Sequence, residues 1–143
     1  MIRELRLRQN YQAILLAALA CFLLEVAWAA AFVEHWLKGI GHDRAWLSGQ
    51  EISPWLQCVT ALLSAILIAA AISTFTRLTG PETARRGIKV AVALWVGLSL
   101  TTHATEYVFE ARPYSLFAIN AGFWLLGMIV MGAIVGGWKK TGT

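Results

Sequence analysis

Apolar residues in this chain gather in four long stretches, each separated from the next by a short polar segment. The stretches cover about residues 11–37, 54–78, 87–109 and 114–138. About 20 apolar residues in a helix are enough to cross the hydrocarbon core of a bilayer. The pattern therefore predicts an all-α polytopic membrane protein with four transmembrane helices in an antiparallel bundle, forming a single membrane domain over residues 1–143.

The segments between the apolar stretches carry the residues that start and stop helices. Ser53 followed by Pro54 is typical of a helix start, with Ser as the N-cap and Pro at the first helical position. Thr79-Gly80-Pro81 interrupts the apolar pattern after the second stretch, and Glu110 to Pro113 predicts a tight turn before the fourth. The connections are therefore short loops without a further folded unit.

The basic residues predict the orientation of the bundle, because cytoplasmic loops of membrane proteins carry more Lys and Arg. One side of the predicted bundle carries nine of them: Arg3, Arg6, Arg8, Arg77, Arg85, Arg86, Lys89, Lys139 and Lys140. The other side carries three: Lys38, Arg44 and Arg112. We therefore expect both termini in the cytoplasm and a multi-pass protein of the cytoplasmic (inner) membrane.

The composition agrees with a lipid environment. Hydrophobic residues make up 58% of the chain and charged residues 14%, whereas soluble domains carry roughly 25% charged residues. The net charge of +4 comes from basic residues at helix ends, so it is a topology signal and does not indicate nucleic-acid binding. The expected partner is the lipid bilayer.

Polar side chains recur at helical spacing within the apolar stretches, so that each set shares one helix face at ~100° per residue. The residues on these faces are Glu25, Trp28, His35, Gln57, Thr60, Ser64, Ser99, His103, Glu106 and Asn120. All of them fall in the predicted outer half of the membrane. Polar groups are costly in hydrocarbon and turn toward one another, so the pattern predicts an outward-facing polar pocket. Such a pocket would bind or conduct a proton, a small cation or a small polar molecule.

Two of these residues have a purely structural alternative. His103 and Glu106 fit equally well as a pair that hydrogen-bonds within the bundle and holds it together. Glu25 differs, because a carboxyl group near the middle of a membrane span is rare and favours a functional or pairing role.

No motif of an enzyme or a cofactor site is found in the sequence. It lacks a glycine-rich phosphate loop and a nucleophile elbow, so we expect neither catalysis nor a cofactor, and an acid–base pair of His103 and Glu106 is a minor alternative. His35, His103 and Glu106 have suitable side chains for a metal ion. Without a compact spacing such as His-Glu-x-x-His, they are weak candidates.

Small residues on the fourth stretch favour close helix packing. Gly132 and Gly136 form a Gly-x-x-x-Gly pair, and Gly127 precedes them. The pair is compatible with a homo-oligomer and with packing inside one bundle. The small size, the missing catalytic motif and seven Trp residues leave a second function open, that of a non-catalytic accessory or structural subunit of a larger membrane complex.

Several segments together are similar to one family. They are Asn10 to Ile14, Trp28, His35-Trp36, Phe109 to Pro113, Leu116 to Gly122 and Met131 to Ile134. The chain thereby resembles the bacterial four-helix membrane family described as domain of unknown function seventeen sixty-one. The resemblance implies a four-helix fold and a membrane location, and it implies no activity.

The chain departs from this family's pattern at three places. Glu25 stands where the family usually has a small residue, Asn120 where it often has Asp, and Ala29 where a Tyr tends to follow the Trp. These departures indicate that the chemistry of the predicted pocket is particular to this member.

Overall fold

The computed structural model describes residues 9–139, and within them the chain is built from helices without a strand. Four basic residues behind the predicted orientation, Arg3, Arg6, Arg8 and Lys140, lie outside the described residues. The elements are α2 (Tyr11–Ile40), α3 (Arg44–Ser48), α4 (Pro54–Leu78), α5 (Ala84–Leu94), η1 (Trp95–Leu100), α6 (Thr101–Phe109) and α7 (Tyr114–Gly137). α5, η1 and α6 continue one another, so four helices are long and apolar enough to cross a membrane. The predicted all-α fold with four spans is confirmed.

Local capping explains where the long helices begin and end. α4 starts at Pro54 because the Ser53 hydroxyl accepts a hydrogen bond from the Leu56 amide at 3.2 Å, as the Ser-Pro pair predicts. α5 starts three residues before the predicted 87, because Thr83 caps the Arg86 amide in the same way. α2 continues past residue 37 to Ile40 and ends where Gly41 adopts a left-handed φ of 77°.

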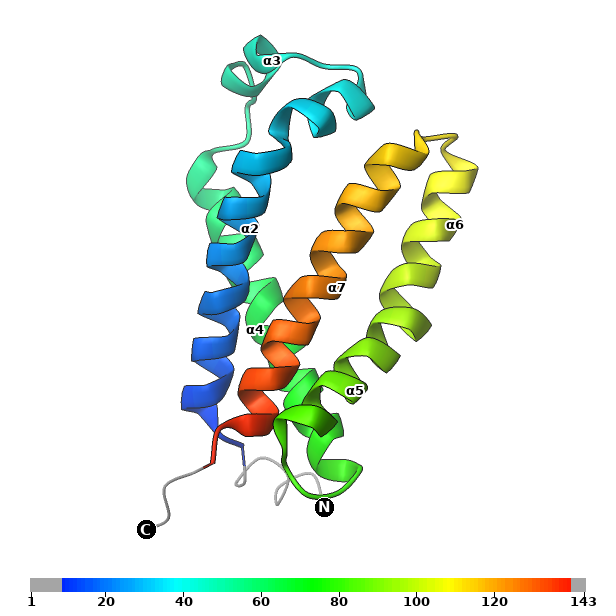
Figure 1. Cartoon of the computed structure of the whole chain (residues 1–143). Coiled ribbons are helices and arrows are strands. Elements are labelled where there is room, and N and C mark those ends of the chain that lie inside the picture. The colour runs from blue at the N-terminus through cyan, green and yellow to red at the C-terminus, as the bar shows by residue number, and fades with distance from the viewer. Residues whose placement is uncertain (1–8, 140–143) are drawn as a thin grey trace.

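α7 is the central helix of the bundle. It packs against α2 on one side and α5 on the other, and it also contacts α4 (Figure 1). The Asn10 side chain donates a hydrogen bond to the Trp138 carbonyl at 3.4 Å, so the described chain begins and ends at the same end of the bundle. We call the half of the bundle around Asn10 and Trp138 the terminal half. The opposite half, which carries α3 and the α6–α7 turn, is the α3 half (Figure 1).

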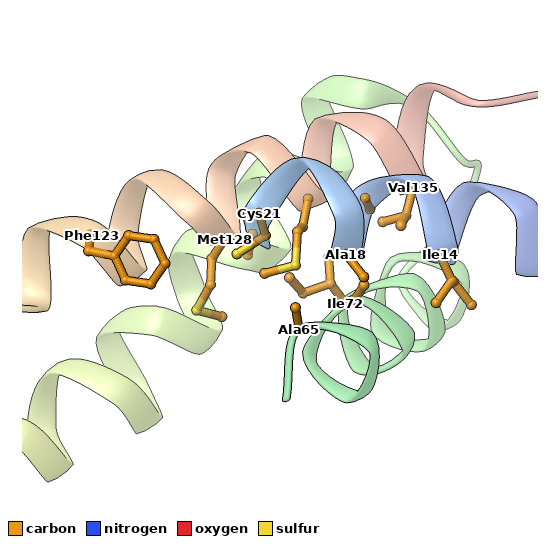
Figure 2. Close-up of a cluster of buried hydrophobic side chains, with 12 residues drawn as sticks. Ile14, Ala18, Cys21, Ala65, Ile72, Phe123, Met128 and Val135 are labelled. Atoms are coloured by element: carbon orange, nitrogen blue, oxygen red, sulfur yellow. The ribbon is translucent and has the colours of Figure 1, made fainter. Parts of the chain in front are cut away.

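The hydrophobic core lies where α2, α4, α5 and α7 meet. Its members are Ile14, Ala17, Ala18, Cys21, Ala65, Ala69, Ile72, Ala91, Phe123, Met128, Met131 and Val135, each 7% exposed or less. Small side chains on α2 and α4 face the larger Met128 and Met131 of α7. The two methionine side chains fill the space between the helices. Figure 2 shows Phe123 at one end of this cluster, toward the α3 half.

Glycines bring the backbones of α5 and α7 into direct contact. A Cβ atom built on Gly87 would lie 1.9 Å from the Gly132 carbonyl oxygen, and one on Gly136 would lie 2.4 Å from that of Thr83. A Cβ on Gly127 would lie 3.1 Å from the Cys21 sulfur of α2. All three α7 glycines of the sequence analysis are therefore used for packing inside one chain, and a homo-oligomer stays a prediction.

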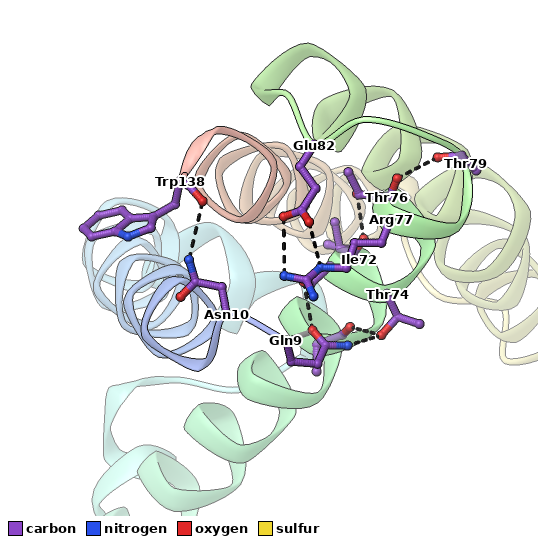
Figure 3. A network of polar contacts seen from close by, with 11 residues as sticks. Gln9, Asn10, Ile72, Thr74, Thr76, Arg77, Thr79, Glu82 and Trp138 are labelled. Carbon is purple, nitrogen blue, oxygen red and sulfur yellow. Dashed lines mark hydrogen bonds and ion pairs between the residues drawn. The ribbon is translucent and has the colours of Figure 1, made fainter. Parts of the chain in front are cut away.

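Polar groups in the terminal half bond to one another (Figure 3). The Gln9 amide donates to the Thr74 hydroxyl at 2.7 Å and accepts from the Ser73 hydroxyl at 3.0 Å. The Arg77 Nε atom lies 3.1 Å from a Glu82 carboxylate oxygen. The hydrogen bonds among Gln9, Ser73 and Thr74 stabilise this end of the bundle. The Arg77 Nε and Nη1 atoms are buried without a hydrogen-bond partner in the described part of the chain.

Candidate functional site

A cleft of about 540 Å³ opens in the α3 half of the bundle. Its walls come from α2, α3, the segment before α4, α4 itself and α7. The lining residues are Glu25, Trp28, Ala29, Phe32, Val33, Trp36, Trp46, Leu47, Gln50, Gln57, Ile119, Asn120 and Phe123. Phe123 belongs to both the core and the cleft, so the cleft begins where the core ends.

The polar side chains of the cleft are one carboxyl group and three amides. Glu25 is the fifteenth of the 30 residues of α2, half-buried, and without a hydrogen-bond or ion-pair partner among residues 9–139. The Asn120 amide of α7 donates to the Tyr107 hydroxyl of α6 at 2.5 Å. Gln50 and Gln57 line the cleft from the side of α4. The cleft therefore offers hydrogen-bonding groups and one acidic group to a ligand.

Aromatic rings make up most of the wall around these groups. The rings of Trp28 and Phe32 lie 4.7 Å apart between centroids, and those of Trp28 and Phe123 lie 6.3 Å apart. The rings of Trp36 of α2 and Trp46 of α3 lie 6.4 Å apart between centroids. The wall is therefore apolar and rich in π faces, as in many small-molecule sites.

The short helix α3 contributes Trp46 and Leu47 to the cleft wall. Asp43 caps it by accepting a hydrogen bond from the Trp46 amide at 3.0 Å, and Arg44 forms an ion pair with Glu34 of α2. The His42 ring stacks on Trp46 at 4.2 Å between centroids. These contacts tie α3 to the end of α2 and hold Trp46 beside Trp36.

The indole nitrogen of Trp28 is buried and has no hydrogen-bond partner within the described part of the chain. A buried N–H group without an acceptor destabilises a fold by about 1–3 kcal/mol. Trp28 lines the cleft, so an acceptor brought there by a ligand would stabilise this residue.

A family model matches residues 12–136, which include every lining residue of the cleft. The chain belongs to the family described as protein of unknown function (DUF1761). The family resemblance inferred from the sequence motifs is thus confirmed. No curated protein and no solved structure matches this DUF1761 chain.

The predicted pocket residues of this DUF1761 chain fall into two groups. Glu25, Trp28, Gln57 and Asn120 line one cleft. The cleft lining does not contain six others, which are His35, Thr60, Ser64, Ser99, His103 and Glu106. Thr60 is exposed on α4 and Ser64 is half-buried there, whereas His35 is exposed with its ring edge toward Phe32. Helix periodicity therefore identifies some of the residues that line the cleft, together with others that do not.

The third span carries three of the six residues outside the lining, namely Ser99, His103 and Glu106. Its middle, η1 at Trp95–Leu100, is a π-helix, in which an extra residue per turn shifts the side chains that follow to another face. The His103 ring nitrogen Nδ1 lies 2.7 Å from the Ser99 carbonyl oxygen of its own helix, and Glu106 is exposed. The neighbouring Tyr107 is buried instead and reaches Asn120.

Nine of the thirteen lining residues were not among the predicted pocket residues, and Trp36, Trp46 and Gln50 are three of them. Trp46 lies in the short helix α3 and Gln50 lies just after it, where no long helical pattern exists. Trp36 lies on α2 next to His35 and therefore points away from the predicted polar face. From the sequence it is explained by the preference of Trp for the membrane interface. The cluster of Trp residues flanking the first loop is the signal that could have found them.

The weak metal candidates are not gathered in one place. Among residues 9–139, no three side chains of His, Cys, Asp or Glu lie close enough together to hold a metal ion. His35 belongs to α2, whereas His103 and Glu106 belong to α6.

Proposed function

We propose that this DUF1761 chain is a membrane-embedded binding protein whose cleft in the α3 half takes up a small molecule. The observation that carries the proposal is the cleft of about 540 Å³, in which Glu25 has no partner among residues 9–139 and lies inside an aromatic wall. Ligand sites typically measure about 300–1,000 Å³ and combine apolar walls with a few polar groups. The function is binding of a molecule with both polar and apolar parts.

The core favours binding over conduction. Met128, Met131 and Ile72 are almost completely buried. Figure 2 shows Met128 and Ile72 on the side of Phe123 that faces the rest of the core. Water and ions would have to cross this close-packed region to pass through the bundle, and apolar packing of this kind holds no water. The cleft is therefore a binding site that is closed toward the terminal half.

The orientation adds where the ligand would come from. In the described chain, Arg77, Arg85, Arg86, Lys89 and Lys139 lie toward the terminal half. With the termini in the cytoplasm, as the basic residues favour, the cleft opens to the outer side of the cytoplasmic membrane. The test is a protease-cleavable tag on either terminus. Cleavage of that tag by a protease added outside right-side-out vesicles would contradict this orientation.

A cleft-filling substitution tests the binding function. Ala29→Trp places an indole in the cleft, whereas Ala30→Trp adds the same side chain at an exposed position of α2 outside the lining. The wild-type protein and both variants, in nanodiscs, are melted with a panel of small cations, anions and neutral molecules. A ligand at 100 times its Kd stabilises a protein by about 2.7 kcal/mol, so hits should raise the Tm of the wild type and of Ala30→Trp but not of Ala29→Trp.

Two results would contradict the proposal. One is a panel in which no compound raises the Tm of the wild type. The other is a set of hits that Ala29→Trp leaves unchanged, because the ligand would then bind elsewhere. Ion flux through the wild-type protein in proteoliposomes would refute the closed core separately.

A second function is favoured by the α6 surface, and we propose it as the alternative: an accessory subunit docked against another membrane protein. The third span has the lowest mean hydropathy and the smallest buried share of the four. Its exposed residues include Thr101, Thr102, Thr105 and Glu106. Native mass spectrometry after gentle extraction tests this alternative. A different chain that binds the wild type and is lost in Glu106→Leu would support docking. A monomer or homo-oligomer alone would contradict it.

A further inference from the structure

We propose that the ligand of the cleft is an organic monocation, an amine or quaternary ammonium group that carries apolar substituents. This inference rests on the binding function proposed above and specifies its substrate class. It depends on three observations, namely the charge balance of the cleft, the chemistry of its wall and its size.

The charge balance favours a cation. Glu25 is the one acidic residue of the lining, and no Lys, Arg or His of the described chain lines the cleft. Its carboxyl group is half-buried near the middle of a membrane span and has no protein partner among residues 9–139. A carboxylate in such a place is stabilised by a positive charge beside it. An anionic ligand would be repelled by the same group.

The wall favours an organic cation over a metal ion. Trp28 and Phe32 follow Glu25 on the same helix at i+3 and i+7, so their rings lie on the side of the carboxyl group. Trp36, Trp46 and Phe123 complete the wall. Ring faces attract ammonium groups, and aromatic cages are a known way to bind quaternary ammonium. A metal ion needs several ligands close together, and among residues 9–139 no three side chains of His, Cys, Asp or Glu are placed to hold one.

The size of the cleft favours a molecule over a bare ion. A volume of about 540 Å³ is far larger than a proton or a hydrated metal ion requires, and it falls in the range of sites for small organic molecules. The aliphatic residues Val33, Leu47 and Ile119 provide apolar contacts beyond the rings. The substituents of the cation would therefore bury apolar surface while the charge meets Glu25.

A pair of shape-matched probes tests the charge requirement. Acetylcholine and 3,3-dimethylbutyl acetate have the same heavy-atom shape, but a quaternary nitrogen in the first is a neutral carbon in the second. Both are titrated, as chemical probes, into wild-type protein in phosphatidylcholine nanodiscs, with empty nanodiscs as the blank for partitioning. Binding is followed by tryptophan fluorescence, because Trp28, Trp36 and Trp46 line the cleft.

The wild-type protein should bind acetylcholine at least about tenfold more tightly than the neutral ester. Glu25→Gln should bring the two affinities to within about twofold of each other, and Glu25→Asp should retain part of the preference. Glu51→Gln is the matched control, since Glu51 is exposed near the same end of the bundle and does not line the cleft. It removes the same charge and should leave the preference unchanged.

The aromatic wall is tested by Trp36→Leu, which keeps an apolar side chain and removes the ring. It should weaken acetylcholine binding about threefold or more and weaken the ester less. Equal loss for the two probes would mean that the ring contributes only apolar contact, and the cation-binding wall would be refuted.

The remaining outcomes separate this inference from the binding function. Equal wild-type affinities, a preference for the ester, or a preference that Glu25→Gln retains would overturn the monocation and leave the binding site standing. Absence of binding by both probes overturns it as well, whichever neutral or anionic compounds raise the Tm in the panel. If that panel also yields no compound, the binding function fails together with it.

Discussion

The two halves of the bundle are built from different residues and pack in different ways. In the terminal half, Gly87 and Gly132 bring α5 and α7 into backbone contact, and the core beside them is closed. In the α3 half, Trp28, Trp36 and Phe123 stand between the helices, and a cleft remains. Lipid provides no hydrophobic force that drives helices together, so side-chain size decides how closely they approach. Small residues close one end of the bundle, and large rings keep the other end open.

Each half holds a buried polar group without a hydrogen-bond partner among the described residues, Arg77 in the terminal half and Trp28 in the α3 half. At the terminal end, Gln9, Ser73 and Thr74 satisfy one another. In the cleft, Glu25 is unpartnered within the described chain, and the Trp28 indole nitrogen is too. A polar group that the fold leaves unpaired is a cost to stability. The halves differ in what surrounds these groups: Arg77 forms an ion pair with Glu82, whereas Glu25 and Trp28 line a cleft.

The largest effect is expected at the backbone contact of the terminal half. Gly87→Ala places a methyl group against the Gly132 carbonyl, so α5 and α7 must separate, with a loss of about 4 kcal/mol or more in the free energy of unfolding. Gly97→Ala is the control, because a Cβ there meets nothing within 4 Å. It should be neutral or stabilising by up to about 1 kcal/mol. Denaturant unfolding in one detergent measures both, and similar values would refute the close approach.

A second comparison removes side chains from each half. Met131 is 0% exposed in the core, so Met131→Ala should cost about 3 kcal/mol through lost burial and the cavity left behind. Phe32 is half-buried at the cleft, and Phe32→Ala should cost about 1 kcal/mol, since its ring is already partly exposed. The same unfolding measurement decides. A larger loss for Phe32→Ala would mean that the aromatic half carries the stability.

A smaller effect is expected where α6 meets α7. Tyr107→Phe removes the hydroxyl that accepts from the Asn120 amide, which should cost about 1 kcal/mol. Tyr114→Phe is the matched control, because Tyr114 is 81% exposed and should change stability little. If both variants unfold at the same denaturant concentration, the Asn120–Tyr107 bond does not hold the third span.

The smallest effect is expected at the ion pair that ties α3 to α2. Both side chains of the Glu34–Arg44 pair are mostly exposed, and exposed pairs contribute about 0–1 kcal/mol. Glu34→Gln should therefore change the free energy of unfolding by less than about 0.5 kcal/mol. A loss above 1 kcal/mol would show that α3 is an integral part of the α3 half.

Much of the architecture follows from local sequence signals. The four apolar stretches predict the four spans because hydrocarbon requires a helix of a certain length with its backbone bonds paired internally. Ser53 with Pro54 predicts the start of α4 to the residue, since capping is a contact between near neighbours. Glu25, Trp28, Gln57 and Asn120 could be assigned to the lining from helix periodicity, which holds along an unbroken α-helix.

Other features were beyond such signals. The periodicity of the third span fails at the π-helix of Trp95–Leu100, where Trp95 donates to the Ala121 carbonyl of α7 at 3.1 Å. That bond joins residues on different helices, so the local pattern carries no trace of it. Trp46 and Gln50 reach the cleft because the chain folds back at Gly41.

The sequence by itself determined the membrane class, the number of spans and the family of this protein, because each depends on apolar length, local capping or shared motifs. Only the tertiary structure decided that the α7 glycines meet Gly87 and Cys21 of the same chain. It also decided that four of the ten predicted pocket residues share one cleft with an aromatic wall. The reason is physical: which face of a helix meets which neighbour depends on contacts between distant segments, and the π-helix of Trp95–Leu100 is enough to turn that face away.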